Sequence, residues 1–338
     1  MDKRAIISPL ISIAIAFAIG AIFIKFIGKS PLEAYASIFK GAFAGEGWGF
    51  TLFSMTSLII TGLAVALGFH CGLFNIGANG QLMVGGMFAA YIALLFSGVP
   101  AFLLLPVVIF SAIAAGGFWG FIPGFLKSKR GTNEVVVTIM MNYIAIGMIG
   151  YLLTYPLKAS PGWIAQSEII PESLWLPRYK GMIGADPTII LAIALAVMVY
   201  FLLWRTKTGY EIRAVGFNPK ASNYGGINVP RTIALAMALS GAIAGLAYFN
   251  YIFAYQHRVV SDVLLGANVG FDGITVALLG KNHPLGIILA SFLLAVLCSG
   301  CLAAQFEIGI PKSFYLFLEG IIIFSFVIFE KVMGGRKE

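Results

Sequence analysis

Two short segments of the chain combine amides, an acid and glycines in a pattern that can bind a polar solute. The first reads NIGANG over residues 75–80, and the second reads NVGFDG over residues 268–273. Each has two glycines and two amide or acidic residues within six positions, a composition that disfavours the interior of a helix. The carboxylate of Asp272 can accept hydrogen bonds from a substrate hydroxyl or from freed backbone amides.

These segments lie in a chain whose composition suits lipid rather than water. Of its 338 residues, 59% are hydrophobic and 11% are charged, and the mean hydropathy is +0.94. Soluble globular proteins carry about 25% charged residues, so this chain lacks the charged surface of a compact soluble body. The 22 Lys and Arg outnumber the 14 Asp and Glu, and in a membrane protein this excess indicates loop orientation rather than nucleic-acid binding.

Apolar runs of about 20 residues, the length that crosses a bilayer, predict an all-α membrane protein with about ten transmembrane helices. The predicted spans are 5–24, 50–67, 81–97, 101–126, 134–155, 188–204, 232–254, 271–280, 284–304 and 313–329. Span 271–280 is too short to cross, so it is either a half-helix or it begins upstream near Leu264. Most Lys and Arg residues lie at alternate span ends, which predicts that both termini are cytoplasmic.

The two glycine-rich segments occupy matching places in halves of opposite orientation, because each precedes a span and the spans are five apart. This predicts an inverted 5+5 repeat in a single transmembrane domain, divided at about 1–155, 156–187 and 188–338. Backbone freed by a broken helix is tolerated only inside protein or beside a watery cavity, and transporters place such breaks on the substrate path near the membrane centre. Alternatively, the glycines permit close helix packing and the Asn and Asp side chains bond across helices.

Several other polar residues in apolar surroundings need partners. Glu134 opens a predicted span, where the positive end of the helix dipole stabilises a carboxylate, and Asn142 lies two turns deeper. His70 is expected to pack at an interface rather than to relay protons. Glu319 has no evident partner in the sequence.

The sequence gives little support for enzyme chemistry or for metal binding. The three histidines lie at no ligand spacing from one another or from the three cysteines, which are expected to be reduced packing residues. A GKS triplet at 28–30 resembles the end of a phosphate-binding loop, but that motif requires a glycine where this chain has Phe23. We therefore expect no metal, no cofactor and no ATP hydrolysis by this chain.

Two segments between the predicted spans are expected on the outer side of the membrane. The segment 29–49 predicts an interfacial helix on the outer leaflet, and the loop 156–187 predicts either an ordered lid or a simple tether.

The longest inner connection, 205–231, predicts a short helix at its centre. Asn218 can cap this helix, Pro219 is favoured at its first position, and Gly225 or Gly226 can end it. A helix this short is not stable alone, so it needs the inner ends of its own protein or the groove of another subunit. A basic loop held at anionic lipid is the alternative.

Four motifs occur in a characteristic order: GLFNIGANGQLMVGGMFAAY (72–91), GTNEVVVTIMMNYIA (131–145), GYEIRAVGFNPKASNYGGI (209–227) and GFDGITVALLGKNHPLG (270–286). Together they resemble the permease subunits of bacterial ATP-binding-cassette (ABC) importers for ribose-like sugars and nucleosides, which are related to the branched-chain amino acid permeases. The nucleoside branch is the most similar. Family members typically carry a carboxylate where this chain has Asn79, so an ionic role at that position is in doubt.

The resemblance implies a permease in the bacterial cytoplasmic membrane that passes nucleosides or a ribose-like sugar. It implies a cytoplasmic ABC ATPase that binds the ATP, a second related permease subunit and an extracellular substrate-binding lipoprotein as partners. The inner loop would then couple to the ATPase through Arg213, Gly216, Asn218, Pro219, Lys220 and Tyr224. The candidates for the path of an uncharged solute are Phe74, Asn75, Asn79, Gln81, Asn142, Asn268 and Asp272.

Two other classes of protein fit parts of the pattern. An ion-coupled secondary transporter of a small polar solute would also have an inverted repeat, but it needs a titratable cluster, and Asp272 is a single candidate. An intramembrane enzyme needs a catalytic pair such as two aspartates, and Asp272 has no intramembrane aspartate partner in the sequence. Dependence on ATP and sensitivity to a proton ionophore distinguish the importer from the secondary transporter.

Overall fold

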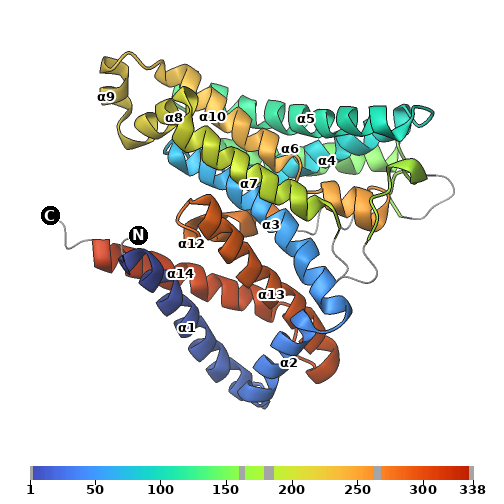
Figure 1. The fold of residues 1–338 in the computed structure, drawn as a ribbon, viewed down its shortest axis with the longest axis vertical. Helices are drawn as coiled ribbons and strands as arrows, with labels where there is room; N and C mark the ends of the chain where they lie inside the picture. The colour runs from blue at the N-terminus through green and yellow to red at the C-terminus, as the bar shows by residue number, and fades with distance from the viewer. Residues whose placement is uncertain (1–2, 160–163, 179–185, 262–267, 335–338) are drawn as a thin grey trace.

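In the computed structural model, the chain folds into a bundle of helices (Figure 1). The structure describes residues 3–159, 164–178, 186–261 and 268–334, and within them the β-structure is an isolated antiparallel bridge between Gln166 and Val260. The first six helices are α1 (Lys3–Phe26), α2 (Pro31–Phe43), α3 (Glu46–His70), α4 (Ala78–Leu95), α5 (Ala101–Arg130) and α6 (Glu134–Thr154). The later helices are η1 (Glu172–Leu174), α7 (Thr188–Arg205), α8 (Lys207–Phe217), α9 (Pro219–Tyr224), α10 (Val229–Ala244), η2 (Tyr251–Gln256), α12 (Val269–Leu279), α13 (Pro284–Ile308) and α14 (Phe314–Gly334).

The described residues form an all-helical, multi-pass membrane protein. Seven of their helices are long and apolar enough to cross a membrane, namely α1, α3, α4, α5, α6, α7 and α13. Each coincides with a predicted span. Helices α10 and α12 are apolar but shorter, and α14 has 21 residues.

The prediction of a continuous helix over 232–254 is wrong, because this segment breaks at the end of α10. Turn-type hydrogen bonds follow, including one from the Leu246 amide to the Ile243 carbonyl oxygen (3.1 Å), and a π-helix, η2, comes next. The carbonyl oxygen of Ala247 accepts a hydrogen bond from the Ser57 hydroxyl of α3 at 3.0 Å. Hydropathy gives no sign of this break, because the residues around it are apolar and the compensating group comes from another helix.

Helix α12 is a half-length helix in the described residues. Its 11 residues span about 16 Å at 1.5 Å per residue, about half of the hydrocarbon thickness. This agrees with the half-helix interpretation of span 271–280. The alternative start near Leu264 lies outside the described residues.

Two predicted short helices are confirmed. Helix α2 forms within 29–49, with the Ser30 side chain at its N-cap and Pro31 in its first turn. Helix α9 begins at Pro219, and the Asn218 side chain accepts a hydrogen bond from the Ala221 amide at 3.1 Å. Helix α8, just before α9, was not predicted and occupies the first part of the inner loop.

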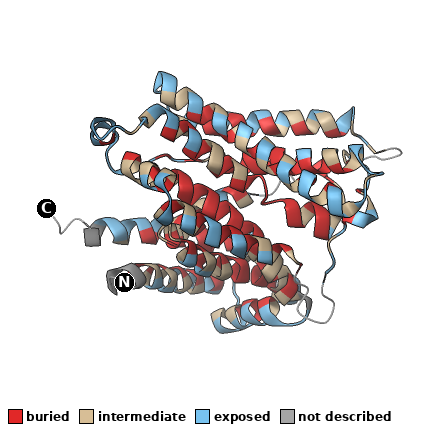
Figure 2. Ribbon diagram, turned by 45° about the horizontal axis from the view of Figure 1, so that its top comes forward, coloured by how far each residue is buried: buried red, intermediate tan, exposed pale blue. Residues whose placement is uncertain are grey.

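Burial is concentrated in the middle of the bundle, and exposed residues cover its outer faces (Figure 2). Helices α3, α4 and α13 are largely buried inside the protein, whereas only 22–28% of the apolar stretches of α1, α5 and α6 is buried. The three cysteines are free thiols that are buried or half-buried, as expected for packing residues.

The most extensive contact between two of the described helices joins α5 to α10, and glycines bring the two backbones together. A Cβ atom added at Gly120 would lie 2.5 Å from the Met237 carbonyl oxygen, and one added at Gly241 would overlap the Gly116 carbonyl oxygen. Backbones that approach so closely gain dispersion contacts, which drive helix association in lipid, where no hydrophobic force operates between helices.

We predict opposite effects from two glycine substitutions. Gly241→Ala should destabilise the protein by about 1–3 kcal/mol, because the new methyl group must push α5 and α10 apart. Gly147→Ala on exposed α6, where an added Cβ meets nothing within 4 Å, should leave the stability unchanged or raise it by about 1 kcal/mol through helix propensity. The melting temperature in detergent, followed by circular dichroism, measures both. Equal effects would contradict the packing described here.

Candidate functional site

A cavity of about 530 Å³ lies between α3, η2, α12 and α14. Its size falls within the range of small-molecule sites. One group of lining residues is aromatic: Phe50, Phe53, Tyr248, Tyr251 and Tyr255. A second group is polar: Ser54, Ser57, Asn268, Asp272, Lys312 and Tyr315. Two of the predicted path residues, Asn268 and Asp272, therefore lie at this cavity.

The acid Asp272 has polar neighbours that the sequence did not indicate. The Tyr315 hydroxyl donates to its Oδ2 atom at 3.3 Å. Glu319, one turn further along α14, accepts a hydrogen bond from the Thr275 hydroxyl at 2.6 Å. Asp272 and Glu319 also line a second, smaller cavity of about 330 Å³. Glu319 thus gains a partner, and Asp272 has a neighbouring carboxyl group.

The amides of the first glycine-rich segment lie in a buried network. The side chains of Asn75 and Gln81 exchange hydrogen bonds at 2.9 and 3.1 Å, and Asn75 also donates to the Ser240 hydroxyl at 2.8 Å. Asn142 of α6 accepts from the Gly80 amide at 2.8 Å and donates to the Ile76 carbonyl oxygen at 3.0 Å. These contacts support a structural role, because they satisfy backbone groups that lipid cannot.

The two glycine-rich segments touch each other. The side-chain oxygen of Asn79 accepts a hydrogen bond from the Gly270 amide at 3.3 Å. A Cβ atom on Gly270 would overlap the backbone of Asn79, so glycine permits this approach. The side-chain amide of Asn79 therefore acts as a neutral acceptor for backbone.

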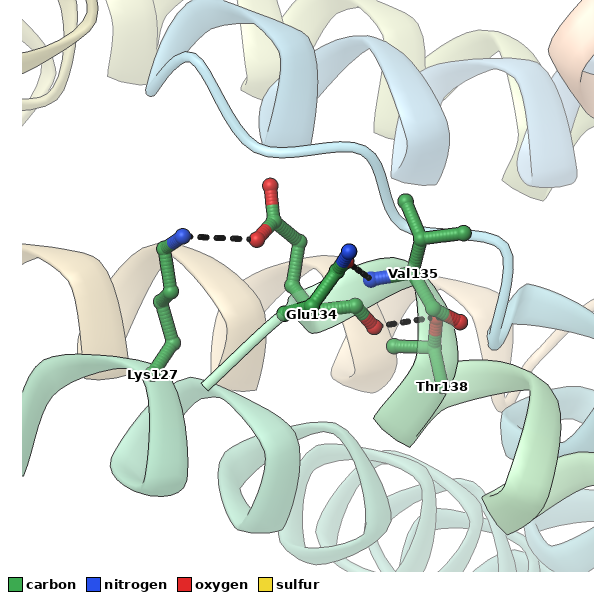
Figure 3. Close-up of polar contacts among 5 residues, drawn as sticks. Lys127, Glu134, Val135 and Thr138 are labelled. Carbon is green, nitrogen blue, oxygen red and sulfur yellow. Dashed lines mark hydrogen bonds and ion pairs between the residues drawn. The ribbon is translucent and has the colours of Figure 1, made fainter. Parts of the chain in front are cut away.

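At the opposite end of the first segment, Phe74 is 38% exposed and packs edge-on against Phe69. Close to it, Glu134 opens α6 as predicted. Its carboxylate pairs with the Lys127 ammonium of α5 at 2.8 Å (Figure 3). The Asn133 side chain caps the same helix by accepting from the Val135 amide at 3.0 Å.

The inner loop is fixed to the end of α3. A Cβ atom on Gly216 would overlap the His70 carbonyl oxygen and lie 3.0 Å from the Gly72 amide. The His70 ring lies 3.0 Å from the Asn282 carbonyl oxygen and packs edge-on against Trp204, which confirms a packing role. Arg213 of α8 stacks over the Trp204 ring, with 5.9 Å from its Cζ atom to the centroid.

Beyond Gly216 the loop is exposed. In α9, Pro219, Lys220 and Tyr224 face outward, and Tyr224 is 94% exposed. Phe217, the last residue of α8, is 88% exposed. Large apolar side chains that project so far from the protein are typical of a docking surface.

The outer loop 156–187 is ordered where the structure describes it and packs along η2. The Leu176 amide donates to the Phe253 carbonyl oxygen at 2.9 Å, and Arg178 stacks over Tyr255 with 4.7 Å from Cζ to the centroid. Trp175 stacks on His257 at 4.0 Å, and burial together with the nearby Arg178 charge lowers the pKa of His257. These contacts favour an ordered lid over a simple tether. Trp163, which also belongs to this loop, lies outside the described residues.

Sequence reasoning missed the tyrosines of the cavity. Tyr248, Tyr251 and Tyr255 recur at spacings of three and four residues, a pattern that indicates one face of a helix. Tyr315 and Glu319 are likewise four residues apart. Tyrosines at helical spacing beside a broken span could therefore have indicated the cavity from the sequence. No sequence pattern indicated that Ser57 also lines it.

Broken membrane helices around a polar, aromatic cavity, together with an exposed helix beyond the bundle, define a transport permease. The chain belongs to the family described as branched-chain amino acid transport system / permease component, which matches residues 47–327. It is thus the permease component of an ABC transporter, which implies a separate ATPase subunit as its partner.

Several characterised proteins are similar along nearly the whole chain. The guanosine ABC transporter permease protein NupP of Bacillus subtilis is 40% identical, over 100% of this chain and 99% of its own length. The nucleoside ABC transporter permease protein NupB of Lactococcus lactis is 35% identical, over 95% of this chain and 90% of its own. The glucose ABC transporter permease protein TsgB13 of Haloferax volcanii is 29% identical, over 96% of this chain and 87% of its own length. No solved structure matches the chain.

We predict that the Asn142 side chain is required for stability. Asn142→Leu leaves the Gly80 amide and the Ile76 carbonyl oxygen without their side-chain partner, which should cost about 1–3 kcal/mol. Met140→Leu, at a 53% exposed position on the same helix, is the control and should have little effect. The melting temperatures of both variants in detergent measure this difference. An unchanged value for Asn142→Leu would favour a path-lining role over a structural one.

Proposed function

We propose that the chain is the permease of a nucleoside importer. The observation that carries this proposal is the 40% identity to a guanosine permease along the whole chain, supported by the 35% identity to a nucleoside permease. The four sequence motifs, which resemble the nucleoside branch, also support a nucleoside importer.

The chemistry of the cavity supports a solute with an aromatic base and a polar sugar. Its aromatic residues offer faces on which a base can stack. Asn268, Ser57 and Asp272 offer donors and acceptors for hydroxyl groups. We propose that Asn268 and Asp272 lie on the substrate path, and that Phe74 lies near its inner end. For Asn75, Asn79, Gln81 and Asn142 a path role stays a prediction, because their described hydrogen bonds are made to protein.

Helix α3 offers a mechanical link between the cavity and the ATPase side. Its N-terminal half carries Phe53 and Ser57 at the cavity, and its last residue, His70, touches Gly216 beside α9. We propose that closure of the ATPases moves α9, and that α3 relays this motion to the cavity and opens it alternately to each side. The coupling residues are those predicted, Arg213, Gly216, Asn218, Pro219, Lys220 and Tyr224.

We further propose an inverted 5+5 repeat of about ten spans in one domain, with both termini in the cytoplasm. The contact between Asn79 and Gly270 supports the repeat, because the equivalent segments of both halves meet there. Figure 1 shows the start of α1, the end of α14 and the α8–α9 segment on the same side of the bundle. A cytoplasmic position for this basic segment agrees with the positive-inside rule.

The proposed partners are an ABC ATPase, a second related permease and an extracellular substrate-binding lipoprotein. Bacillus subtilis has two proteins described as guanosine ABC transporter permeases, NupP and NupQ, and this chain is similar to both, at 40% and 29% identity. This supports a heteromeric pair of permeases in the bacterial cytoplasmic membrane.

An ion-coupled secondary transporter is the second candidate, and one observation favours it. Asp272 and Glu319 line the same smaller cavity, so the titratable cluster that this class requires has two acids rather than one. Uptake into sealed vesicles separates the candidates. The ABC importer requires ATP and resists a proton ionophore, whereas the secondary transporter would work without ATP and stop with the ionophore.

We predict that the exposed aromatic residues of the inner loop are needed for coupling. The double change Phe217→Ala and Tyr224→Ala removes two side chains that make little contact within the chain, so the folded protein should remain stable. Co-purification of the ATPase and ATP-dependent guanosine uptake should each fall at least tenfold, because interface anchors of this size typically contribute about 2 kcal/mol each.

Leu32→Ala on α2 is the matched control, because Leu32 is 82% exposed and belongs to the opposite, outer end of the protein. It should leave ATPase recovery and uptake unchanged. Full ATPase recovery with the double variant would remove the coupling role of α9.

A further inference from the structure

The hydroxyl group of Tyr248 is buried without a partner. Tyr248 is 3% exposed, and its Oη atom has no hydrogen-bond partner among the described residues. A buried hydroxyl left unpaired is unfavourable, so such groups are rare unless a ligand or water satisfies them. Tyr248 lines the larger cavity, so the unsatisfied hydroxyl belongs to a residue in the wall of a space large enough for a ligand.

The acid Asp272 lines the same cavity and retains acceptor capacity. Its described hydrogen bond is the one from Tyr315 to Oδ2, and a carboxylate offers about four acceptor positions over two oxygens. Two hydroxyl groups on adjacent carbons match such a carboxylate, because each can donate to one of its oxygens. The Tyr248 hydroxyl can both donate and accept, which suits a hydroxyl ligand better than an ion.

Aromatic side chains set the orientation of a ligand in this space. Phe53, Tyr251 and Tyr255 form a continuous cluster, with ring centroids 5.4–6.1 Å apart. They come from α3 and η2, whereas Asp272 comes from α12. A base stacked on the aromatic cluster can direct its sugar toward the carboxylate.

We propose that Asp272 and Tyr248 form a subsite for the cis-diol of the ribose ring. The inference rests on the proposed nucleoside function and assigns part of the substrate selection to the permease itself. The carboxylate of Asp272 accepts hydrogen bonds from the 2′- and 3′-hydroxyl groups, and the Tyr248 hydroxyl completes their hydrogen bonding. Nucleosides that lack these hydroxyl groups leave the carboxylate and the tyrosine unpaired and bind more weakly.

The test is equilibrium binding of radiolabelled guanosine and 2′,3′-dideoxyguanosine to the permease pair with its ATPase in lipid nanodiscs, without the lipoprotein. Omitting the lipoprotein ensures that its own specificity does not contribute. The wild type should bind guanosine at least tenfold more tightly than the dideoxy compound, since leaving buried hydrogen-bonding groups unpaired typically costs a factor of ten or more. Asp272→Asn should reduce this preference to about twofold, mainly because it weakens the binding of guanosine.

Tyr248→Phe keeps the test valid if Asp272→Asn fails to fold. It should reduce the preference about threefold and leave the melting temperature unchanged or higher, because it removes an unsatisfied hydroxyl group. Tyr143→Phe, at a 66% exposed position outside the cavity, is the matched control and should change neither value. A preference that Asp272→Asn and Tyr248→Phe both leave unchanged, or equal wild-type affinity for both compounds, would overturn the subsite.

Uptake by the complete importer separates this inference from the proposed function. Wild-type proteoliposomes that import guanosine with ATP, while the nanodisc complex shows no diol preference, would retain the importer and refute the subsite. Absence of import of any nucleoside would refute the proposed function and the subsite together.

Discussion

The structure depends on one constraint, which is that lipid offers no hydrogen bonds to freed backbone groups. Each break in a helix must therefore be closed by a side chain from elsewhere in the protein. Asn142 makes a hydrogen bond to backbone at the start of α4, and Ser57 makes one to backbone in the turn after α10. Asn79 makes one to backbone at the start of α12. These contacts draw the broken segments together around α3, and that convergence brings polar and aromatic side chains to one cavity.

Helix α3 also connects the two ends of the protein. Because α3 is a continuous helix of 25 residues, we propose that it transmits a displacement at His70 to Phe53 and Ser57. Gly216 presses the inner loop directly onto the end of α3. The contact is so close that a larger residue there would disturb folding as well as coupling. The exposed side chains of α9 are therefore the better place to separate the two effects.

Features coded by local residues could be predicted from the sequence, and features built by distant contacts could not. Asn218 and Pro219 specify the start of α9 within a few positions, and long apolar runs specify the long helices. The break after α10 was missed because its partner, Ser57, lies 190 residues away from Ala247. Asp272 was identified from its type and setting. Its neighbour Tyr315 required the packing of α12 against α14, and the presence of Tyr248 at the same cavity required the turn after α10, and no local pattern contains either.

The most direct test of the account is whether ATP at the ATPase changes access to the cavity. Ser54, a half-buried residue that lines it, can be replaced by cysteine in a chain whose three native cysteines are changed to serine. The measurement is the rate at which a membrane-impermeant maleimide labels this cysteine from outside in proteoliposomes of the complete importer. We expect the rate to change severalfold when ATP is added, and only when the ATPase is present. An identical rate with and without ATP, in vesicles that import guanosine, would contradict the relay through α3.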